Sequence, residues 1–598
     1  MKSAIIVAII WVILLVAAIG LVRTYGTRTL PQADELWALY DAGPSIHMQW
    51  LWATWAEHRI PLAKLIWKSV LQSTEYDFRA GDFVTITALA LMALGLVWTA
   101  AKLRGRVSVS DAFFPLALLN FGQAQVFLWW WQINHVLAPV LAGLMLMLFV
   151  LRGNNLQLGH AGLLSVGLIL FVLCGPGGLP YVLALAAWLF VWALSVWPPY
   201  TQLQQRRLAF VLLTALTALL LTVFYFVDYK PYFPVNDPPT ISSWAPSPGL
   251  IASGVAYLQI LGLSLSTVTK PYAIVCGLAV LGFGIVTAGV LIRALWQRPA
   301  ESLRLFGLIM LLSAQAVIVA VIAWSRAGMG LDYIYQGHYL TIMVPALCAF
   351  YFVWQIAGGR FARFVQFGMA VVLAALLPAS YVQAKQVGNA LRQQSAAFER
   401  DVRAGMPAEI LAEHYFASDV VPRADKITRI LIAHKANGIG IFKEIRDEPH
   451  YRTDVLSLDA SIRDGVVLRD GVAEGNEAKS SLTFALGQPR HVYAVRLRYA
   501  YVKTVNLWPT LRTYWRNSTL EEFNDTNAYA STVSGPDQPT WALIDGKIHT
   551  DAKVRGERVL TVWIDKTIDE FRIYPDSVPC EFRLPIVEVL ARASGNSD

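Results

Sequence analysis

Long apolar stretches recur along the first two thirds of the chain and dominate its hydrophobic pattern. A helix needs about 20 apolar residues to cross the hydrocarbon core of a bilayer, and by this measure the pattern predicts about eleven membrane-spanning helices. The predicted ranges are 4–22, 83–101, 110–128, 134–151, 160–175, 179–196, 208–226, 271–292, 304–324, 338–357 and 363–382. Residues 1–382 are therefore predicted to form a polytopic α-helical membrane domain.

Three further features refine this picture. The loop 23–82 contains a tryptophan-rich amphipathic stretch, Ile46–Leu71, which is typical of a helix that lies in the membrane interface. The segment 250–268 is apolar but short and rich in Ser and Gly, which predicts a second interfacial or re-entrant helix. The apolar run that follows Met1 is long enough to span, so we interpret it as an uncleaved first transmembrane helix rather than a signal peptide.

The hydrophobic pattern changes after residue 382. Residues 383–454 have helical periodicity and are predicted to form a helical linker region. From residue 455 onward, short alternating apolar runs are separated by Gly, Pro, Asn and Asp. Several short strands at this spacing predict a soluble, jelly-roll-like β-sandwich domain over residues 455–598.

Composition and charge agree with a membrane protein. Of the 598 residues, 56% are hydrophobic and only 15% are charged, whereas soluble proteins carry about a quarter charged residues. The net charge of +8 arises largely from Lys and Arg in short loops between predicted spans. Positive residues in such loops determine how the helices are oriented in the membrane, so this charge does not indicate nucleic-acid binding. This asymmetry predicts a cytoplasmic N-terminus, with the loop 23–82 and the C-terminal domain outside.

An acidic pair, Asp34–Glu35, is the most informative candidate for chemistry. It follows the first predicted span by about a dozen residues, on the predicted outer side. A carboxylate held near the membrane surface can act as a general base toward an acceptor hydroxyl. The alternative is that both residues only cap the next helix, because acidic side chains favour a helix N-terminus.

This layout resembles the GT-C superfamily, the integral-membrane glycosyltransferases that use polyprenyl-phosphate sugars. Protein O-mannosyltransferases and lipid A aminoarabinose transferases share an acidic pair after the first span, a similar number of spans and often a soluble C-terminal domain. The resemblance covers residues 1–382 and implies that Asp34 is the catalytic base, with Glu35 in support. The soluble part lacks the WWD-type signature of oligosaccharyltransferases, which argues against an N-glycosylating enzyme.

Some shorter stretches are similar to bacterial GT-C-like proteins of unassigned function. These are Glu57–Pro61, Phe127–Ile133, Ser325–Leu331 and Gly337–Tyr339. Members of that group tend to have Ser-Arg-Tyr where this chain has Gly337-His338-Tyr339, and an Arg at that position would bind phosphate oxygens bidentately. His338, with Tyr339 beside it, is a weaker, pH-dependent substitute, which leaves Arg326 as the candidate to hold the donor phosphate. His58 and Arg59 either contact the lipid phosphate or are an interfacial His and a snorkelling Arg.

Three residues near the next predicted outer surface are candidates for sugar or acceptor binding. Trp131 belongs to a tryptophan run that is either an aromatic belt or a stacking platform for a sugar ring. Gln132 and His135 follow it and either bond sugar hydroxyls or cap the next span. The sequence assigns no cofactor and no metal ligands, and a requirement for a divalent metal is the alternative.

The predicted function is that of an inverting glycosyltransferase in a bacterial plasma membrane. Its expected partners are a polyprenyl-phosphate sugar donor, a glycan, lipid or protein acceptor outside the cytoplasm, and membrane lipids. The alternatives are a non-catalytic glycan flippase or envelope-assembly protein, and a polysaccharide polymerase or ligase.

Overall fold

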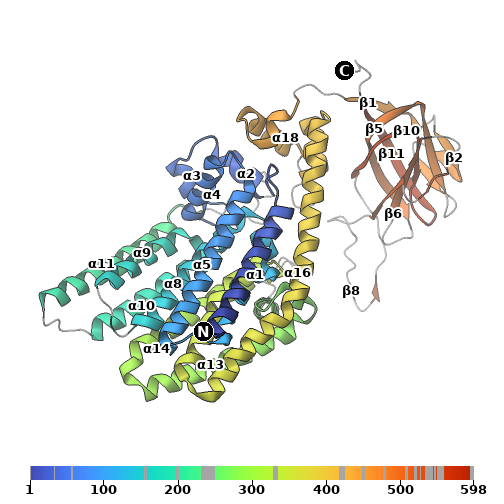
Figure 1. Ribbon diagram of the computed structural model, residues 1–598. Coiled ribbons are helices and arrows are strands. Elements are labelled where there is room, and N and C mark those ends of the chain that lie inside the picture. Colours follow the sequence, from blue (N-terminus) through green and yellow to red (C-terminus); the bar gives the residue numbers. More distant parts are fainter. Residues whose placement is uncertain are drawn as a thin grey trace. The chain divides into compact units, whose positions relative to one another are not determined.

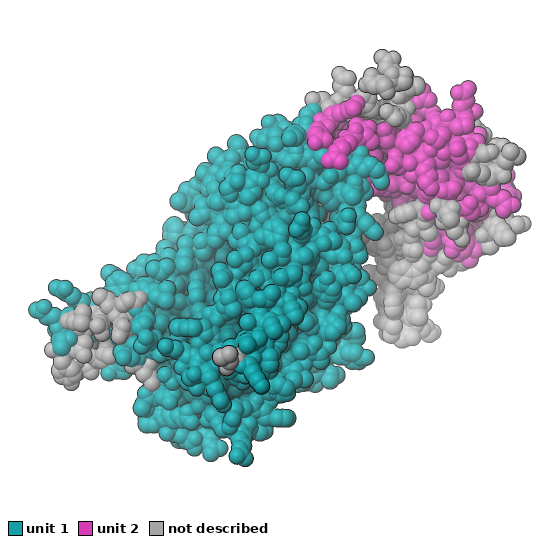
Figure 2. Space-filling model, viewed as in Figure 1, with its two compact units in different colours: residues 1–400, 429–443 teal, residues 401–428, 444–598 magenta. Residues whose placement is uncertain are grey.

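The chain folds into two compact units (Figure 2). The helical unit comprises Met1–Arg400 and Arg429–Lys443, and the sheet unit comprises Asp401–Thr428 and Glu444–Asp598. The computed structural model describes residues 2–32, 34–55, 58–153, 155, 158–195, 201–229, 249–327, 334–416, 424–446, 451–458, 461–469, 472–475, 480–504, 510–517, 522–524, 527–532, 543–544, 547–548 and 558–592.

Helices make up most of the helical unit (Figure 1), and many of them are apolar. The main ones are α1 (Lys2–Tyr25), α5 (Phe78–Arg104), α8 (Leu137–Arg152), α9 (Leu158–Leu173), α10 (Leu179–Ser195), α11 (Gln202–Tyr225), α13 (Ala273–Gln297), α14 (Ser302–Arg326), α15 (His338–Ala357) and α16 (Gly359–Arg403). Within the described residues, 9 helical stretches are long and apolar enough to cross a membrane. Apolar helices followed by a strand-rich C-terminal part are therefore confirmed, but the predicted count of eleven spans is not.

The predicted span 110–128 is broken into short pieces. They are η1 (Val109–Ala112), α6 (Phe113–Leu118), η2 (Phe121–Gln123) and α7 (Ala124–Phe127), and η3 (Trp130–His135) follows. Two buried side chains bond the local backbone at the break: Asn120 Oδ1 accepts from Gly122 N at 2.8 Å, and Gln123 Nε2 donates to the Leu118 carbonyl. Irregular backbone is tolerated among membrane helices where protein groups satisfy it, which explains why apolar composition alone misread this segment.

The segment predicted as interfacial or re-entrant contains α12 (Leu250–Leu263), which packs antiparallel to the start of α13. A Cβ atom on Gly262 would lie 2.0 Å from the Ala273 carbonyl oxygen, and one on Gly277 would lie 2.0 Å from that of Leu258. Only glycine permits this approach of the two backbones. Because α12 is about 21 Å long and lies against α13 and α14, its geometry favours a re-entrant segment over a surface helix.

The tryptophan-rich stretch Ile46–Leu71 is not one interfacial helix. After α2 (Asp34–Ala42), it contains α3 (Met48–Trp52), the residues Trp55 and His58, which exchange backbone hydrogen bonds, and α4 (Pro61–Ser73). Pro61 starts α4 at the position where a missing N–H costs least. The tryptophan rings at positions 50, 55 and 67 of this stretch are buried within the protein. The amphipathic pattern therefore reflects packing against protein rather than contact with lipid.

The predicted linker region 383–454 is divided between the two units. α16 continues without interruption past residue 382, and the part of α18 (Ala424–Ala436) from Arg429 onward belongs to the helical unit. There His434 Nε2 donates to the Leu36 carbonyl at 3.0 Å, which ties this segment to α2. η10 (Gly440–Glu444) follows, whereas α17 (Ala408–Phe416) belongs to the sheet unit.

The sheet unit contains a nine-stranded antiparallel sheet with the order β3-β4-β11-β5-β10-β6-β7, in which β1 also pairs with β11 and β2 with β5. The strands are β1 (Tyr451–Leu456), β2 (Ile462–Asp464), β3 (Val466–Arg469), β4 (Val472–Gly475), β5 (Ser481–Thr504), β6 (Thr510–Arg516), β7 (Ala528–Thr532), β10 (Arg558–Tyr574) and β11 (Cys580–Arg592). Two further short strands, β8 (Leu543–Ile544) and β9 (Lys547–Ile548), pair with each other.

The long strands β5 and β10 make this sheet curl. Residues 481–485 of β5 pair with β2 and with the end of β10. Farther along β5, residues 490–499 pair with the first part of β10, and residues 492–504 pair with β11. The register shifts along β10, between Trp563 and Lys566 and between Ile568 and Glu570, mark the bend. Such irregularities allow one strand to serve two layers. The observed form is one curled sheet around a common core, rather than two separately paired sheets.

We predict that residues 444–598 fold without the helical unit, because the hydrophobic core of the sheet lies entirely between Val466 and Ala591. The purified fragment is expected to be soluble, with a β-type circular dichroism spectrum and a cooperative thermal transition. A fragment ending at residue 579 lacks β11, the strand that pairs with β1, β4 and β5, and should not fold. A helical or unfolded spectrum for the longer fragment would contradict the prediction.

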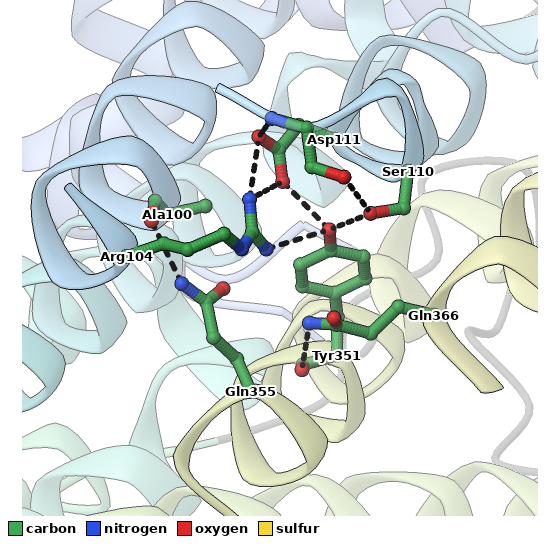
Figure 3. A network of polar contacts seen from close by, with 8 residues as sticks. Ala100, Arg104, Ser110, Asp111, Tyr351, Gln355 and Gln366 are labelled. Carbon is green, nitrogen blue, oxygen red and sulfur yellow. Dashed lines mark hydrogen bonds and ion pairs between the residues drawn. The ribbon is translucent and has the colours of Figure 1, made fainter. Parts of the chain in front are cut away.

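A buried ion pair joins α5, η1 and α15 within the helical unit (Figure 3). Both Asp111 carboxylate oxygens lie 2.9 Å from Arg104 Nη1, and Ser108 N donates to Oδ2 at 2.7 Å. The Tyr351 hydroxyl donates to Asp111 Oδ1 at 2.6 Å and lies 3.0 Å from Ser110 Oγ. Every charge in this cluster has a partner, which is the arrangement expected of a structural network.

Candidate functional site

Glu35 has a structural role at the start of α2. It is 1% exposed, and its two carboxylate oxygens accept three hydrogen bonds. Gln32 N donates to Oε2 at 2.9 Å, and Trp131 N donates to Oε1 at 3.0 Å. The third donor is Trp67 Nε1, at 3.4 Å. Glu35 therefore fixes η3, which carries Trp131, against the start of α2.

Asp34 differs from its neighbour in both burial and bonding. Its side chain is half-buried, and within the described part of the chain its carboxylate accepts no hydrogen bond. It therefore does not act there as a hydrogen-bonding helix cap, although a negative charge in the first turn is still favourable. Burial raises the pKa of Asp34 to about 6 and that of Glu35 to about 7. Of the two, Asp34 has the available carboxylate and a pKa suited to a base near neutral pH.

We predict that Glu35→Ala destabilises the protein by about 1–3 kcal/mol for each buried donor left without a partner. Glu35→Gln keeps one carbonyl oxygen and should cost less. Tyr40→Ala, at an exposed position of the same helix, is the matched control and should have little effect. The measurement is the thermal unfolding midpoint of detergent-solubilised protein, followed by tryptophan fluorescence. Equal midpoints for Glu35→Ala and Tyr40→Ala would contradict the structural role.

Three histidines from distant segments converge near the same end of the helical unit. His58 precedes α4, His135 ends η3, and His338 begins α15. The rings of His135 and His338 are stacked, with centroids 4.2 Å apart and planes 7° apart, and the ring of His58 lies edge-on to His135 at 6.4 Å. Arg326, the last residue of α14, is close enough to interact electrostatically with His338. We name His58, His135, His338 and Arg326 the histidine–arginine cluster.

A small cavity of about 30 Å³ opens beside this cluster. His58, Asn134 and His135 line its polar part, and the remaining lining is largely apolar, with Ala138, Pro139, Cys174, Ile318 and Ile342. Among the described residues, the buried atoms Asn134 Oδ1 and His338 Nδ1 make no hydrogen bond. Burial lowers the pKa of His58 to about 4, so this imidazole is neutral at physiological pH. Asn134 Oδ1 therefore gives the cavity an unused hydrogen-bonding atom beside an apolar wall, a composition typical of ligand sites, whereas His338 belongs to the cluster and is not among the lining residues.

Arg59 contacts protein rather than the cavity. It is buried, and its guanidinium donates to the carbonyl oxygens of Tyr225, Val227 and Asp228, the latter two at 2.8 and 2.9 Å. These carbonyls follow the end of α11, where backbone acceptors lack helical partners. The geometry favours a structural role for Arg59 over both the phosphate contact and the snorkelling side chain that the sequence suggested.

Trp131 is buried between Trp55 and Trp67, with ring centroids 5.4 and 5.0 Å away. Its burial contradicts both predicted roles, the lipid-facing belt and the open sugar platform. Gln132 is also buried, and its Oε1 has no hydrogen-bond partner among the described residues. Tyr339 is buried, and its ring packs against that of His338 with the centroids 4.4 Å apart. It therefore contributes to the packing of the cluster.

Sequence reasoning missed three buried charged residues in α4 and α5. Lys64 donates to the carbonyls of Trp50 and Ala53 at 2.9 and 2.8 Å, and Lys68 donates to that of Gly43 at 3.0 Å. Burial lowers the pKa of Lys64 to about 7 and that of Lys68 to about 8. Their positions four residues apart, in step with the apolar face of α4, were the available signal.

The third such residue is Asp82. It lies inside α5, is 2% exposed, and has no partner for Oδ1 among the described residues. The N-cap of this helix is Asp77, because its side chain accepts from Arg79 N at 3.1 Å. Asp82 is close enough to Glu35 for the two carboxylates to interact.

Among the residues that the structure describes, no group of three or more His, Cys, Asp or Glu side chains is placed to hold a metal ion. No family model matches the chain, and no similar sequence was found among curated proteins.

Proposed function

We propose that the protein is a membrane glycosyltransferase of the GT-C type, with a GT-C-like membrane domain and a soluble domain built on the curled sheet. It transfers a sugar from a polyprenyl-phosphate donor to an acceptor outside the cytoplasm of a bacterial cell. The N-terminus is cytoplasmic in this proposal, and the end of the helical unit that carries α2–α4, together with the sheet unit, faces outward, as the Lys and Arg distribution favours.

One observation carries the proposal: a single short segment, Trp131–His135, links the acidic pair to the cavity. Its first residue is bonded to Glu35, the neighbour of Asp34, and its last residue stacks on His338 in the histidine–arginine cluster. An available carboxylate and a group of anion-binding side chains thus belong to one framework. Inverting transfer from a phosphate-linked sugar needs both a base for the acceptor and stabilisation of the leaving phosphate.

The reaction then proceeds as a direct displacement. Asp34 accepts the proton of an acceptor hydroxyl, the hydroxyl oxygen bonds to the anomeric carbon, and the bond from that carbon to the phosphate oxygen breaks. The polyprenyl phosphate leaves with the bonding electrons and its added negative charge. Arg326 stabilises that charge, and the histidines of the cluster bond the phosphate oxygens. The cavity of about 30 Å³ has room for about two water-sized groups, so it suits phosphate oxygens, and the sugar lies outside it.

The test is to incubate purified protein in lipid nanodiscs with a panel of polyprenyl-phosphate sugars and to measure free polyprenyl phosphate. Release with at least one donor, stimulated by a glycan or lipid acceptor, is the expected result. A matched preparation with Arg326→Gln should bind the same donor more weakly. Absence of release and of transfer with every donor would overturn the proposal.

A polysaccharide polymerase or ligase is the second candidate, because the histidine–arginine cluster brings four cationic or hydrogen-bonding side chains together and a pyrophosphate-linked donor also needs such groups. The two candidates differ in the leaving group. Release of polyprenyl pyrophosphate, rather than polyprenyl phosphate, would favour the polymerase or ligase.

A further inference from the structure

The outward side of β6 and of the end of β10 has an unusual composition. Along β6, Leu511 and Trp515 point into the core, whereas Arg512, Tyr514 and Arg516 point outward, as strand alternation requires. The facing strand presents Glu570, Arg572 and Tyr574 on the same side. We call these six residues the arginine–tyrosine face; β6 and β10 are labelled in Figure 1.

The register makes this face a regular array. Arg512 pairs with Tyr574, Tyr514 with Arg572, and Arg516 with Glu570. Each aromatic ring therefore lies opposite an arginine, and the rings of Tyr514 and Tyr574 meet at 5.4 Å and 79°. At about 3.4 Å per residue the array extends roughly 14 Å along the strands.

Two of the three arginines on this face have no acidic partner among the described residues. Arg516 forms an ion pair with Glu570. Arg572 is half-buried, donates to Thr483 Oγ1 at 2.8 Å and to the Tyr574 hydroxyl at 3.3 Å, and stacks on the Phe523 ring at 4.1 Å. Arg512 is exposed, and its cross-strand neighbours are Tyr574 and Ala530. A partly desolvated guanidinium without a counter-charge favours an anionic ligand.

The other half of the curled sheet has a different outward surface. There α17 packs on the strands: Glu413 bonds Arg496 and Thr561, and the ring of His414 lies 4.1 Å from that of Trp563. Arg496 is thus neutralised by a helix that belongs to the unit. The arginine–tyrosine face has no such described helix and keeps an excess of positive charge.

We propose that the arginine–tyrosine face binds an acidic glycan, whose carboxylates contact Arg512 and Arg572 and whose sugar rings lie on Tyr514 and Tyr574. A guanidinium pairs with a carboxylate through two parallel hydrogen bonds, and a tyrosine ring offers an apolar face beside a polar hydroxyl. The choice of a glycan over another polyanion rests on the proposed function, in which this unit lies outside the cytoplasm. The acceptor of the proposed transfer is then an acidic glycan.

The experiment measures binding to the full-length protein in detergent, without any donor. The probes are a short oligogalacturonate, a neutral dextran oligomer of the same length, and single-stranded DNA of the same charge. The wild type is expected to bind the oligogalacturonate in preference to both others. Arg512→Gln with Arg572→Gln should weaken that binding about tenfold or more, because each lost charged hydrogen bond costs about a factor of ten.

Arg498→Gln is the matched control, since it removes the same charge from an exposed position of β5 in the same unit. It should change the affinity less than twofold. An equal loss in the control, equal binding of dextran, or tighter binding of DNA would each overturn the proposal. Asp34→Asn should bind the oligogalacturonate as the wild type does. Glycan binding in a protein that transfers no sugar would overturn only the proposed function, whereas transfer without such binding would overturn only this inference.

Discussion

Asp34→Asn is expected to lower sugar transfer by about a hundred- to ten-thousand-fold, which is the usual contribution of a positioned general base. The substitution keeps the size of the side chain and removes its ability to accept the proton. Folding should survive, because the carboxylate makes no hydrogen bond within the described part of the chain and Asn is as good as Asp at a helix N-terminus. The measurement is turnover per folded molecule with a donor that the wild type uses.

The control for this substitution is Asp41→Asn, which changes the same chemical group on the same helix, α2. It should leave turnover close to that of the wild type. If Asp34→Asn retains full turnover, Asp34 is not the base, and Glu35 or His58 becomes the next candidate.

The dependence of the transfer rate on pH is an independent test of Asp34 as the general base. Burial raises the pKa of Asp34 to about 6, and a base acts only when deprotonated. Transfer by the wild type should therefore rise as the pH increases through about 6 and then level off. The residual activity of Asp34→Asn should lack that rise. A wild-type rate that falls over this range would contradict the assignment.

Asp111→Ala is expected to destabilise the protein by about 3–5 kcal/mol, the cost of leaving one charge of a buried ion pair without its partner. Asp111 is fully buried and bonds Arg104, Tyr351 and Ser108 (Figure 3). Its loss removes the acceptor that joins α5, η1 and α15. The measurement is again the thermal unfolding midpoint in detergent, converted to free energy where unfolding is reversible.

Two further variants distinguish the stability cost of an unpaired charge from the cost of lost contacts. Tyr351→Phe removes one hydroxyl and should cost only about 1 kcal/mol. Arg104→Met combined with Asp111→Leu replaces the pair by apolar groups and should recover most of the stability, because no unpaired charge remains. If the double variant is as unstable as Asp111→Ala, the cost arises from packing, and the ion-pair explanation is wrong.

The candidate site was predictable in part. Asp34, His58, Arg326 and His338 were chosen from their residue types and their positions near predicted span ends, and the structure brings the last three together with His135. His135 was assigned to sugar contacts, because nothing in the local pattern shows which distant ring it meets. The division of roles between the two acidic residues also needed the contact of Glu35 with Trp131, 96 positions away.

The errors share one physical cause. Arg59 and Trp131 have the composition of membrane-interface residues, and only the structure shows that carbonyls of α11 and two tryptophan rings surround them. The predicted span 110–128 was apolar enough to cross a membrane, but Asn120 and Gln123 satisfy a broken backbone there. A hydrophobic pattern reports that a side chain avoids water, and it does not distinguish burial in protein from burial in lipid.

The sequence by itself determined the two-part organisation, the many apolar helices and the strand-rich C-terminal part. These follow from periodicity and composition, which are properties of neighbouring residues and need no knowledge of distant contacts. Only the tertiary structure decided that α16 continues past the predicted domain boundary at residue 382, how β5 and β10 bend into one curled sheet, and which charged side chains contact one another. Those outcomes depend on pairings between residues far apart in the chain, whose free energies arise from burial and geometry that a linear pattern does not contain.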